Sequence, residues 1–209
     1  MITNQAPAFH RASPLNAFHR ANALTYASLL SAIGAIASAY AGNSAAAGAL
    51  LGLAVLADTF DGWFARLFRR TAEEQTFGAE LDSLSDAIAF GAAPCICMAL
   101  IAPRLDGWQA MAWWMAFAIF ASCAITRLAF YNVTQERTTG FVGLPAPVAA
   151  LVWATALLID PGAAVSVLVL IGAAVAMVAP LPLPRPVGLG LAAFAAWPVI
   201  VIAAHISGL

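Results

Sequence analysis

Four aspartates stand in two close pairs within stretches of the sequence that are otherwise strongly apolar. Asp58 and Asp61 are three residues apart, and Asp82 and Asp86 are four residues apart. Residues three or four apart project from the same face of a helix, one turn from each other. Burying a carboxylate in apolar surroundings is costly unless the charge is compensated, so each pair requires partners. The pairs are therefore candidates for a site that binds cations.

Folding these two stretches into a helical hairpin would bring the four carboxylates together. With the turn centred near residue 72, Asp58 falls level with Asp86, and Asp61 falls level with Asp82. Carboxylates packed so closely repel one another, and bound divalent cations would remove that repulsion. Oxygen ligands with no histidine or thiol nearby favour Mg²⁺ or Mn²⁺ over zinc. We predict a site of two such ions held by Asp58, Asp61, Asp82 and Asp86.

This arrangement suits phosphoryl transfer. Two metal ions held by shared carboxylates can neutralise a pyrophosphate and stabilise the leaving phosphate during in-line displacement. One carboxylate must also take the proton of the attacking hydroxyl. We predict this role for Asp86, which lies one turn beyond Asp82 on the side facing away from the connecting loop. Gly62, Ala65 and Gly78 leave space for a ligand or allow close helix packing, although packing alone would not explain the acids.

Composition places this chemistry in a membrane. Of the 209 residues, 63% are hydrophobic and 9% are charged, which is far less charge than a soluble domain of this size carries. Several apolar runs approach the ~20 residues that a helix needs to cross a bilayer. We therefore predict an all-α, polytopic transmembrane helix bundle of six to eight spans. The expected spans are 22–41, 45–68, 77–102, 108–131, 144–159, 162–179 and 188–207.

The arginines predict the orientation of these spans. All nine basic residues are arginine, and cytoplasmic loops carry an excess of positive charge. Arg104 alone falls on one side of the predicted membrane. The other side, which holds the N-terminus and the loop joining the second and third spans, should therefore be cytoplasmic. The eight arginines on that side are Arg11, Arg20, Arg66, Arg69, Arg70, Arg127, Arg137 and Arg185.

An N-terminal segment, residues 1–21, is expected to precede the membrane domain of residues 22–209. The first 20 residues are polar and interrupted by Pro7 and Pro14, so we expect no cleavable signal peptide. The stretch from Pro14 to Arg20 could lie along the membrane surface, and a polar tail is an equally good interpretation. The three cysteines lack paired metal-site spacing and are expected to be small core residues.

The spacing of the acids resembles the signature of the CDP-alcohol phosphatidyltransferase family. Eight positions fit it, in the order Asp58-x2-Asp61-Gly62-x2-Ala65-Arg66-x11-Gly78-x3-Asp82-x3-Asp86. The gap between Arg66 and Gly78 is somewhat longer than in the commonest form of the pattern and falls in the predicted cytoplasmic turn. The resemblance implies a membrane enzyme that transfers a phosphatidyl group from CDP-diacylglycerol to an alcohol and releases CMP.

The resemblance also implies roles for particular residues. The implied metal ligands are Asp58, Asp61, Asp82 and, unless it serves as the base, Asp86. The implied neighbours of the CDP-linked lipid are Gly62, Ala65, Arg66 and Gly78, with Asn22 and Thr25 at the start of the first span. Arg66 could pair two phosphate oxygens or, alternatively, extend to the interface. We expect a homodimer, as in small enzymes of this family, in a bacterial or archaeal cell membrane with the active site facing the cytoplasm.

Further segments resemble the phosphatidylserine synthase form of these motifs. They are Glu80 to Asp86, Phe90 to Pro94, Arg127 to Ala129 with Asn132, and Phe141 to Pro147. This favours L-serine as the acceptor, with Arg127 pairing its carboxylate and Asn132 hydrogen-bonding to it. Arg127 could instead anchor a helix at the interface, and Asn132 could cap a helix end. Phe130 stands where an arginine is usual, which leaves glycerol phosphate, inositol phosphate and inositol open as acceptors.

A cation or proton transporter is a competing interpretation, since buried aspartates also line ion pathways. Such a protein should distribute its acids along a route, often in two inverted repeats. Here the four acids are confined to one predicted hairpin, which favours the enzyme. The sequence has no basic run or aromatic motif of the kind that binds nucleic acid, so the expected partners are the substrates and membrane lipids.

Overall fold

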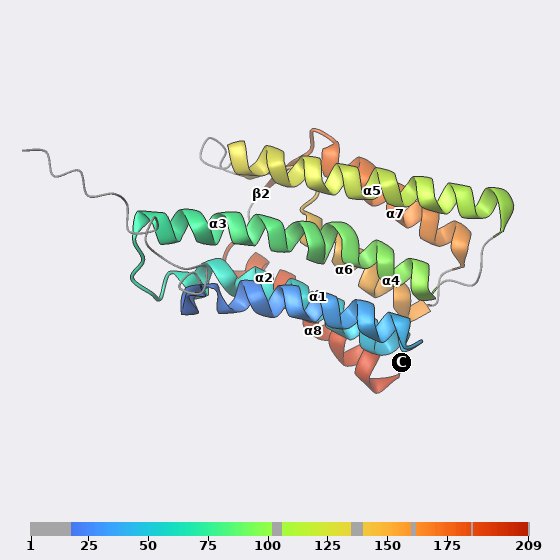
Figure 1. Cartoon of the computed structure of the whole chain (residues 1–209), viewed down its shortest axis with the longest axis horizontal. Helices are drawn as coiled ribbons and strands as arrows, with labels where there is room; N and C mark the ends of the chain where they lie inside the picture. Colours follow the sequence, from blue (N-terminus) through green and yellow to red (C-terminus); the bar gives the residue numbers. More distant parts are fainter. Residues whose placement is uncertain (1–17, 102–105, 135–139, 160–161, 185, 209) are drawn as a thin grey trace, which may run out of the picture.

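Long apolar helices lying roughly along one axis make up most of the described chain (Figure 1). The computed structural model describes residues 18–101, 106–134, 140–159, 162–184 and 186–208. Its helices are η3 (Arg20–Asn22), α1 (Ala23–Tyr40), α2 (Ser44–Ala65), α3 (Ala72–Asp86), η4 (Ala87–Ala92), α4 (Ala93–Ile101), α5 (Gly107–Thr134), α6 (Ala146–Ala156), η5 (Leu157–Ile159), α7 (Ala163–Val178) and α8 (Leu189–Ser207). Two short strands, β1 (Gly140–Val142) and β2 (Pro182–Pro184), complete the elements.

The lengths of these helices confirm an all-α, polytopic membrane protein. Within the described residues, five helical segments are long and apolar enough to cross a bilayer, namely Arg20–Tyr40, Ser44–Ala65, Ala72–Ile101, Gly107–Thr134 and Leu189–Ser207. The segments Ala146–Ile159 and Ala163–Val178 are apolar but shorter, as the sequence predicted for the fifth and sixth spans. The N-terminal segment lies largely outside the described residues, so its interfacial placement stays a prediction.

The turn between α2 and α3 differs from the prediction. The second span was expected to reach residue 68 and the third to begin at 77, but α2 ends at Ala65 and α3 begins at Ala72. A capping box starts α3: the Thr71 hydroxyl accepts a hydrogen bond from the Glu74 N–H at 3.2 Å, and the Glu74 carboxylate accepts one from the Thr71 N–H at 2.8 Å. The helix therefore begins in polar sequence that hydropathy assigns to a loop.

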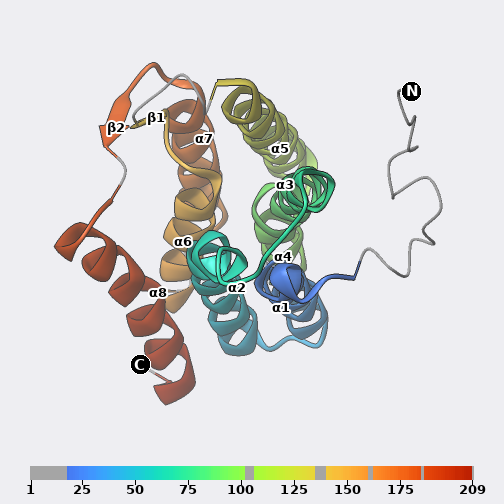
Figure 2. The same ribbon diagram turned by 90° about the vertical axis from the view of Figure 1, so that its left-hand side faces the viewer.

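The packing of α1 is what holds the acid-bearing helices in place. This helix contacts α2 along its length and also contacts α3, η4 and α4, while α2 packs against α6 and α8 (Figure 2). Small buried residues such as Ala32, Ala35, Ala47 and Ala54 line these contacts. Small side chains let membrane helices approach closely. Lipid tails are as apolar as the side chains, so van der Waals contact between closely packed helices is a main source of their association energy.

A π-helical turn, η4, follows the last acid of α3 directly. The Ala93 N–H donates to the Ile88 carbonyl, five residues back, instead of four. Pro94 is the sequence reason, because proline has no N–H to give to the carbonyl four residues earlier. A wide turn absorbs that lost hydrogen bond without ending the helix. Consequently α3, η4 and α4 form one continuous rod.

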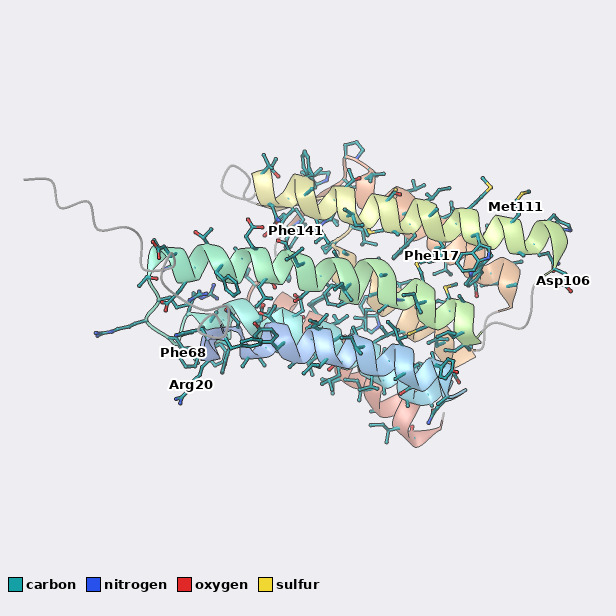
Figure 3. The ribbon with its side chains drawn as sticks, in the orientation of Figure 1. Arg20, Phe68, Asp106, Met111, Phe117 and Phe141 are labelled. Carbon is teal, nitrogen blue, oxygen red and sulfur yellow. The ribbon has the colours of Figure 1, made fainter. Side chains whose placement is uncertain are left out.

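Two loops at one end of the bundle are pinned together by β1 and β2. The strands are antiparallel, with Phe141 opposite Leu183 and Val142 opposite Pro182. The Gly143 N–H also donates to the Leu181 carbonyl at 2.9 Å. The sequence did not predict this pairing, which fixes the loop after α5 against the loop after α7. Arg20 and Phe68 mark this end of the bundle, and Asp106 lies at the opposite end (Figure 3).

Candidate active site

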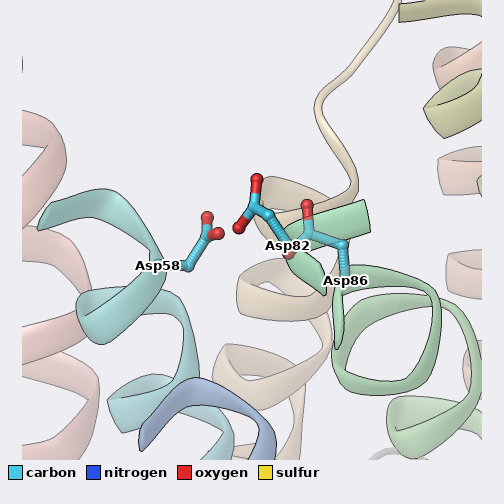
Figure 4. Close-up of side chains that lie close together, drawn as sticks. All are labelled: Asp58, Asp82 and Asp86. Atoms are coloured by element: carbon cyan, nitrogen blue, oxygen red, sulfur yellow. The ribbon is translucent and has the colours of Figure 1, made fainter. Parts of the chain in front are cut away.

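Three carboxylates meet between α2 and α3 (Figure 4). Oxygen atoms of Asp58, Asp82 and Asp86 all lie within 4.8 Å of one another, and the three residues are half-buried. The Oδ1 atom of Asp82 is buried with no hydrogen-bond partner among the described residues. An all-oxygen set of this size, with an unsatisfied buried oxygen, fits a hard divalent cation such as Mg²⁺ or Mn²⁺.

Asp61, the fourth predicted ligand, lies beside this group with a partner from another helix. Its Oδ2 accepts a hydrogen bond of 3.0 Å from the hydroxyl of Thr25, a buried residue near the start of α1. Asp61 also interacts electrostatically with Asp58, Asp82 and Asp86. The structure places the Thr25 hydroxyl on an acid of the site, and the predicted position of Thr25 near the lipid substrate stays a prediction.

The residues predicted to surround CDP fall into two groups. Gly62 is exposed, a Cβ added to it would meet no described atom within 4 Å, and it lines a cavity together with Arg66. Ala65 is buried one turn further on. Gly78 instead marks a close helix approach, because a Cβ there would lie 3.1 Å from Oδ1 of the buried Asn22. The structure therefore brings Gly78 and Asn22 together.

A cavity of about 1030 Å³ opens beside the acids. Asp58, Asp61 and Arg66 form its polar wall. Most of the remaining wall is apolar and comes from α2, α6, α8 and the paired loops, including Phe60, Trp63, Phe141, Leu144, Leu183, Phe194 and Trp197. A charged wall that continues into an apolar one suits a molecule with a polar head and hydrocarbon chains.

Arg127 lies inside the bundle rather than at an interface. Its side chain is buried, and it is near enough to Asp58 and Asp86 to interact electrostatically with both. The Cζ atom stands 5.1 Å from the centroid of the Tyr131 ring and 5.6 Å from that of Phe141. This position argues against the alternative that Arg127 is a surface anchor. Phe130 is 50% exposed on the outside of α5, so an arginine there would not add charge to this interior.

Asn132 does not cap a helix end, and its contact with the acceptor stays a prediction. It is exposed, and its Nδ2 donates to the Ser83 hydroxyl at 2.6 Å, which links α5 to α3. It does not cap α5, which continues to Thr134, and it is not among the residues that line the cavity.

Sequence reasoning missed the aromatic surroundings of Arg127. Tyr131 follows Arg127 by four residues, so the helical period could have placed it on the same face. Phe141 comes from a loop, and no periodicity connects it with α5. Both rings also line the cavity, and their centroids lie 5.5 Å apart.

Comparison with known proteins agrees with this site. Residues 18–180 match the CDP-alcohol phosphatidyltransferase family, and the chain belongs to that family. The match includes all eight positions of the predicted signature.

Several relatives carry names that specify serine phosphatidyl transfer or archaetidylserine synthesis. The chain is 34% identical over 137 residues, 62% of its length, to a Mycobacterium bovis protein named CDP-diacylglycerol–serine O-phosphatidyltransferase, and spans 46% of it. It is 39% identical over 110 residues to the archaetidylserine synthase of Methanothermobacter thermautotrophicus, covering 53% of this chain and 45% of that protein. A Helicobacter pylori CDP-diacylglycerol–serine O-phosphatidyltransferase is 35% identical over 108 residues, covering 51% and 43%. The chain thus spans less than half the length of these relatives.

Proposed function

We propose that the protein transfers a phosphatidyl group from CDP-diacylglycerol to L-serine, giving phosphatidylserine and CMP. The observation that carries the proposal is the convergence of Asp58, Asp82 and Asp86, with Asp61 beside them. Family membership supports phosphatidyl transfer over cation transport, and the names of the relatives support serine.

The site residues supply what the reaction requires. Asp58, Asp61 and Asp82 would hold the divalent ions, which when bound neutralise the pyrophosphate of the CDP-linked lipid, and Asp86 would serve as the base. Arg66, on the cavity wall, pairs with phosphate oxygens. The part of the apolar wall that α2 and α8 form receives the acyl chains, and the buried Arg127 pairs with the serine carboxylate.

The chemical step is one displacement at phosphorus. The serine hydroxyl oxygen attacks the phosphorus that carries the diacylglycerol, and the bond from that phosphorus to the oxygen of CMP breaks. Asp86 takes the hydroxyl proton as the new bond forms, so that a neutral alcohol becomes an effective nucleophile. CMP leaves with the electron pair of the broken bond.

We further propose that the site faces the cytoplasm. Serine and CMP are water-soluble, so they would enter and leave the site from this aqueous side. Asp58 and Asp82 lie about 10–15 Å along their helices from the α2–α3 turn, taking a rise of 1.5 Å per residue. Arg69 and Arg70 lie in that turn and Arg20 is at the same end of the bundle (Figure 3). Positive charge gathers on the cytoplasmic side of membrane proteins.

Purified protein given CDP-diacylglycerol and Mn²⁺ or Mg²⁺ tests the proposal by CMP release. Serine, glycerol phosphate, inositol phosphate and inositol would be supplied separately, with the lipid product identified by mass spectrometry. We expect CMP and phosphatidylserine with serine, and neither product after chelation with EDTA. CMP release only with another alcohol would overturn the serine assignment, and none with any alcohol would overturn the reaction.

A further inference from the structure

The guanidinium of Arg127 is unusual because it is buried beside acids and yet surrounded by rings. The residue is 6% exposed, and its Nε has no hydrogen-bond partner within the described part of the chain. Asp58 and Asp86 are close enough to attract it. An arginine beside carboxylates commonly forms short, paired hydrogen bonds with them. Here the groups that stand over the guanidinium are the rings of Tyr131 and Phe141.

Both rings lie within the range of a cation–π interaction. The distances from Cζ, 5.1 Å to Tyr131 and 5.6 Å to Phe141, fall inside the ~6 Å limit for that attraction. The attraction is stronger where water is excluded. The attraction to the two rings favours a position of the guanidinium away from Asp58 and Asp86 and so opposes direct pairing of Arg127 with these carboxylates.

The two rings are themselves fixed from different elements. Tyr131 is one helical turn beyond Arg127 on α5. Phe141 belongs to β1, whose pairing with Leu183 of β2 holds the loop in place. The rings pack on one another at 5.5 Å between centroids, and both line the same cavity as Asp58. The Nε–H of a guanidinium held this way, which has no partner among the described residues, is available to an anion bound beside the two rings.

We propose that Tyr131 and Phe141 are positioning residues that hold Arg127 ready for the carboxylate of the acceptor. This inference rests on the proposed function, since it requires an acceptor with a carboxylate. The rings do not touch the reacting atoms and act through Arg127. They set the affinity for the acceptor and leave the affinity for the CDP-linked lipid and the metal requirement unchanged.

Leucine substitutions test the proposal by separating the kinetic constants of the two substrates. In Tyr131→Leu and Phe141→Leu we expect the KM for serine to rise about tenfold, while the KM for CDP-diacylglycerol and kcat stay within about twofold. Tyr131→Phe and Phe141→Tyr keep a ring and should keep the wild-type KM for serine. The matched control is Phe130→Leu on the outer face of α5, which should change neither constant.

A carboxylate-free acceptor distinguishes positioning from a general loss of structure. Ethanolamine, supplied at high concentration, lacks the group that Arg127 would bind, so the leucine variants should lower the preference for serine over ethanolamine by about tenfold. An equal rise in the KM of both substrates, or an unchanged KM for serine, would overturn the inference. If Phe141→Leu fails to accumulate in membranes, Tyr131→Leu provides the same comparison from within a helix. If the wild-type protein rejects serine but releases CMP with another alcohol, the proposed acceptor is wrong. The inference about Tyr131 and Phe141 then fails for that reason, before any variant is compared.

Discussion

At the scale of single residues, the site is an acid cluster whose members have different partners. Asp58, Asp82 and Asp86 share one space, whereas Asp61 is tied to α1 through Thr25. A hydroxyl that donates to a ligand carboxylate orients it toward the metal, and such outer contacts are commonly worth 10- to 100-fold in metal affinity, by order of magnitude. Thr25 therefore contributes to the site through its hydrogen bond to Asp61.

Removal of the Thr25 hydroxyl should weaken metal binding. Thr25→Val keeps the shape of the side chain and loses the donor to Asp61, so we expect the affinity for Mn²⁺ to fall about tenfold. Titration of Mn²⁺ followed by electron paramagnetic resonance measures this directly. Thr25→Ser retains the hydroxyl and serves as the control. A raised KM for CDP-diacylglycerol with unchanged Mn²⁺ affinity would instead place Thr25 at the lipid.

Asp86→Asn should separate proton transfer from binding. The amide keeps the size of the side chain but accepts no proton at neutral pH, so we expect kcat to fall about 100-fold or more. The KM for CDP-diacylglycerol should change little. Turnover at the wild-type rate would show that another group takes the proton.

At the scale of elements, the paired loops set the position of the aromatic rings at the site. Gly143 follows β1 with φ +75°, and a Cβ added there would collide with the backbone carbonyl of Met177 on α7. Only glycine combines that conformation with such close contact. The close packing of the paired loops on α7 therefore depends on Gly143.

Gly143→Ala should destabilise the protein. We expect a loss of about 1–3 kcal/mol, because the left-handed backbone is strained and the carbonyl must move. Thermal unfolding in detergent checks the prediction. Gly172→Ala, on α7 where a Cβ meets no described atom within 4 Å, is the control and should leave the unfolding temperature unchanged or slightly raised. Equal unfolding temperatures for the two variants would contradict this account of the loops.

At the scale of the whole molecule, the bundle has two chemically different ends. Arg20 and Phe68 lie at one end, and Asp106 lies at the other (Figure 3). We expect cysteine introduced as Arg69→Cys to be labelled by a membrane-impermeant maleimide only from the cytoplasmic side. Asp106→Cys should be labelled only from the outside. The reverse pattern would refute the proposed orientation.

Much of this architecture was predictable from the sequence, and the failures have two causes, one local and one long-range. Hydropathy located the spans, and helical spacing with a reflection about the turn placed Asp58 near Asp86. The start of α3 was missed because Thr71 and Glu74 stabilise a helix in polar sequence. The contacts of Thr25 with Asp61, and of Phe141 with Arg127, join segments far apart in the chain. Local patterns carry no information about such pairings.

The wide turn at η4 lets the two halves of this rod, α3 and α4, face different directions. In a regular helix each residue is rotated by about 100° from the one before it, so the direction of every side chain is fixed relative to all the others. The extra residue in the wide turn after Asp86 changes the rotation between α3 and α4. The acids of α3 can therefore face α2 while Cys97 and Met98 of α4 face the core. Deleting Ala92 would restore the ordinary pitch and swing the acid-bearing half of the rod, α3, away from its partner helix α2.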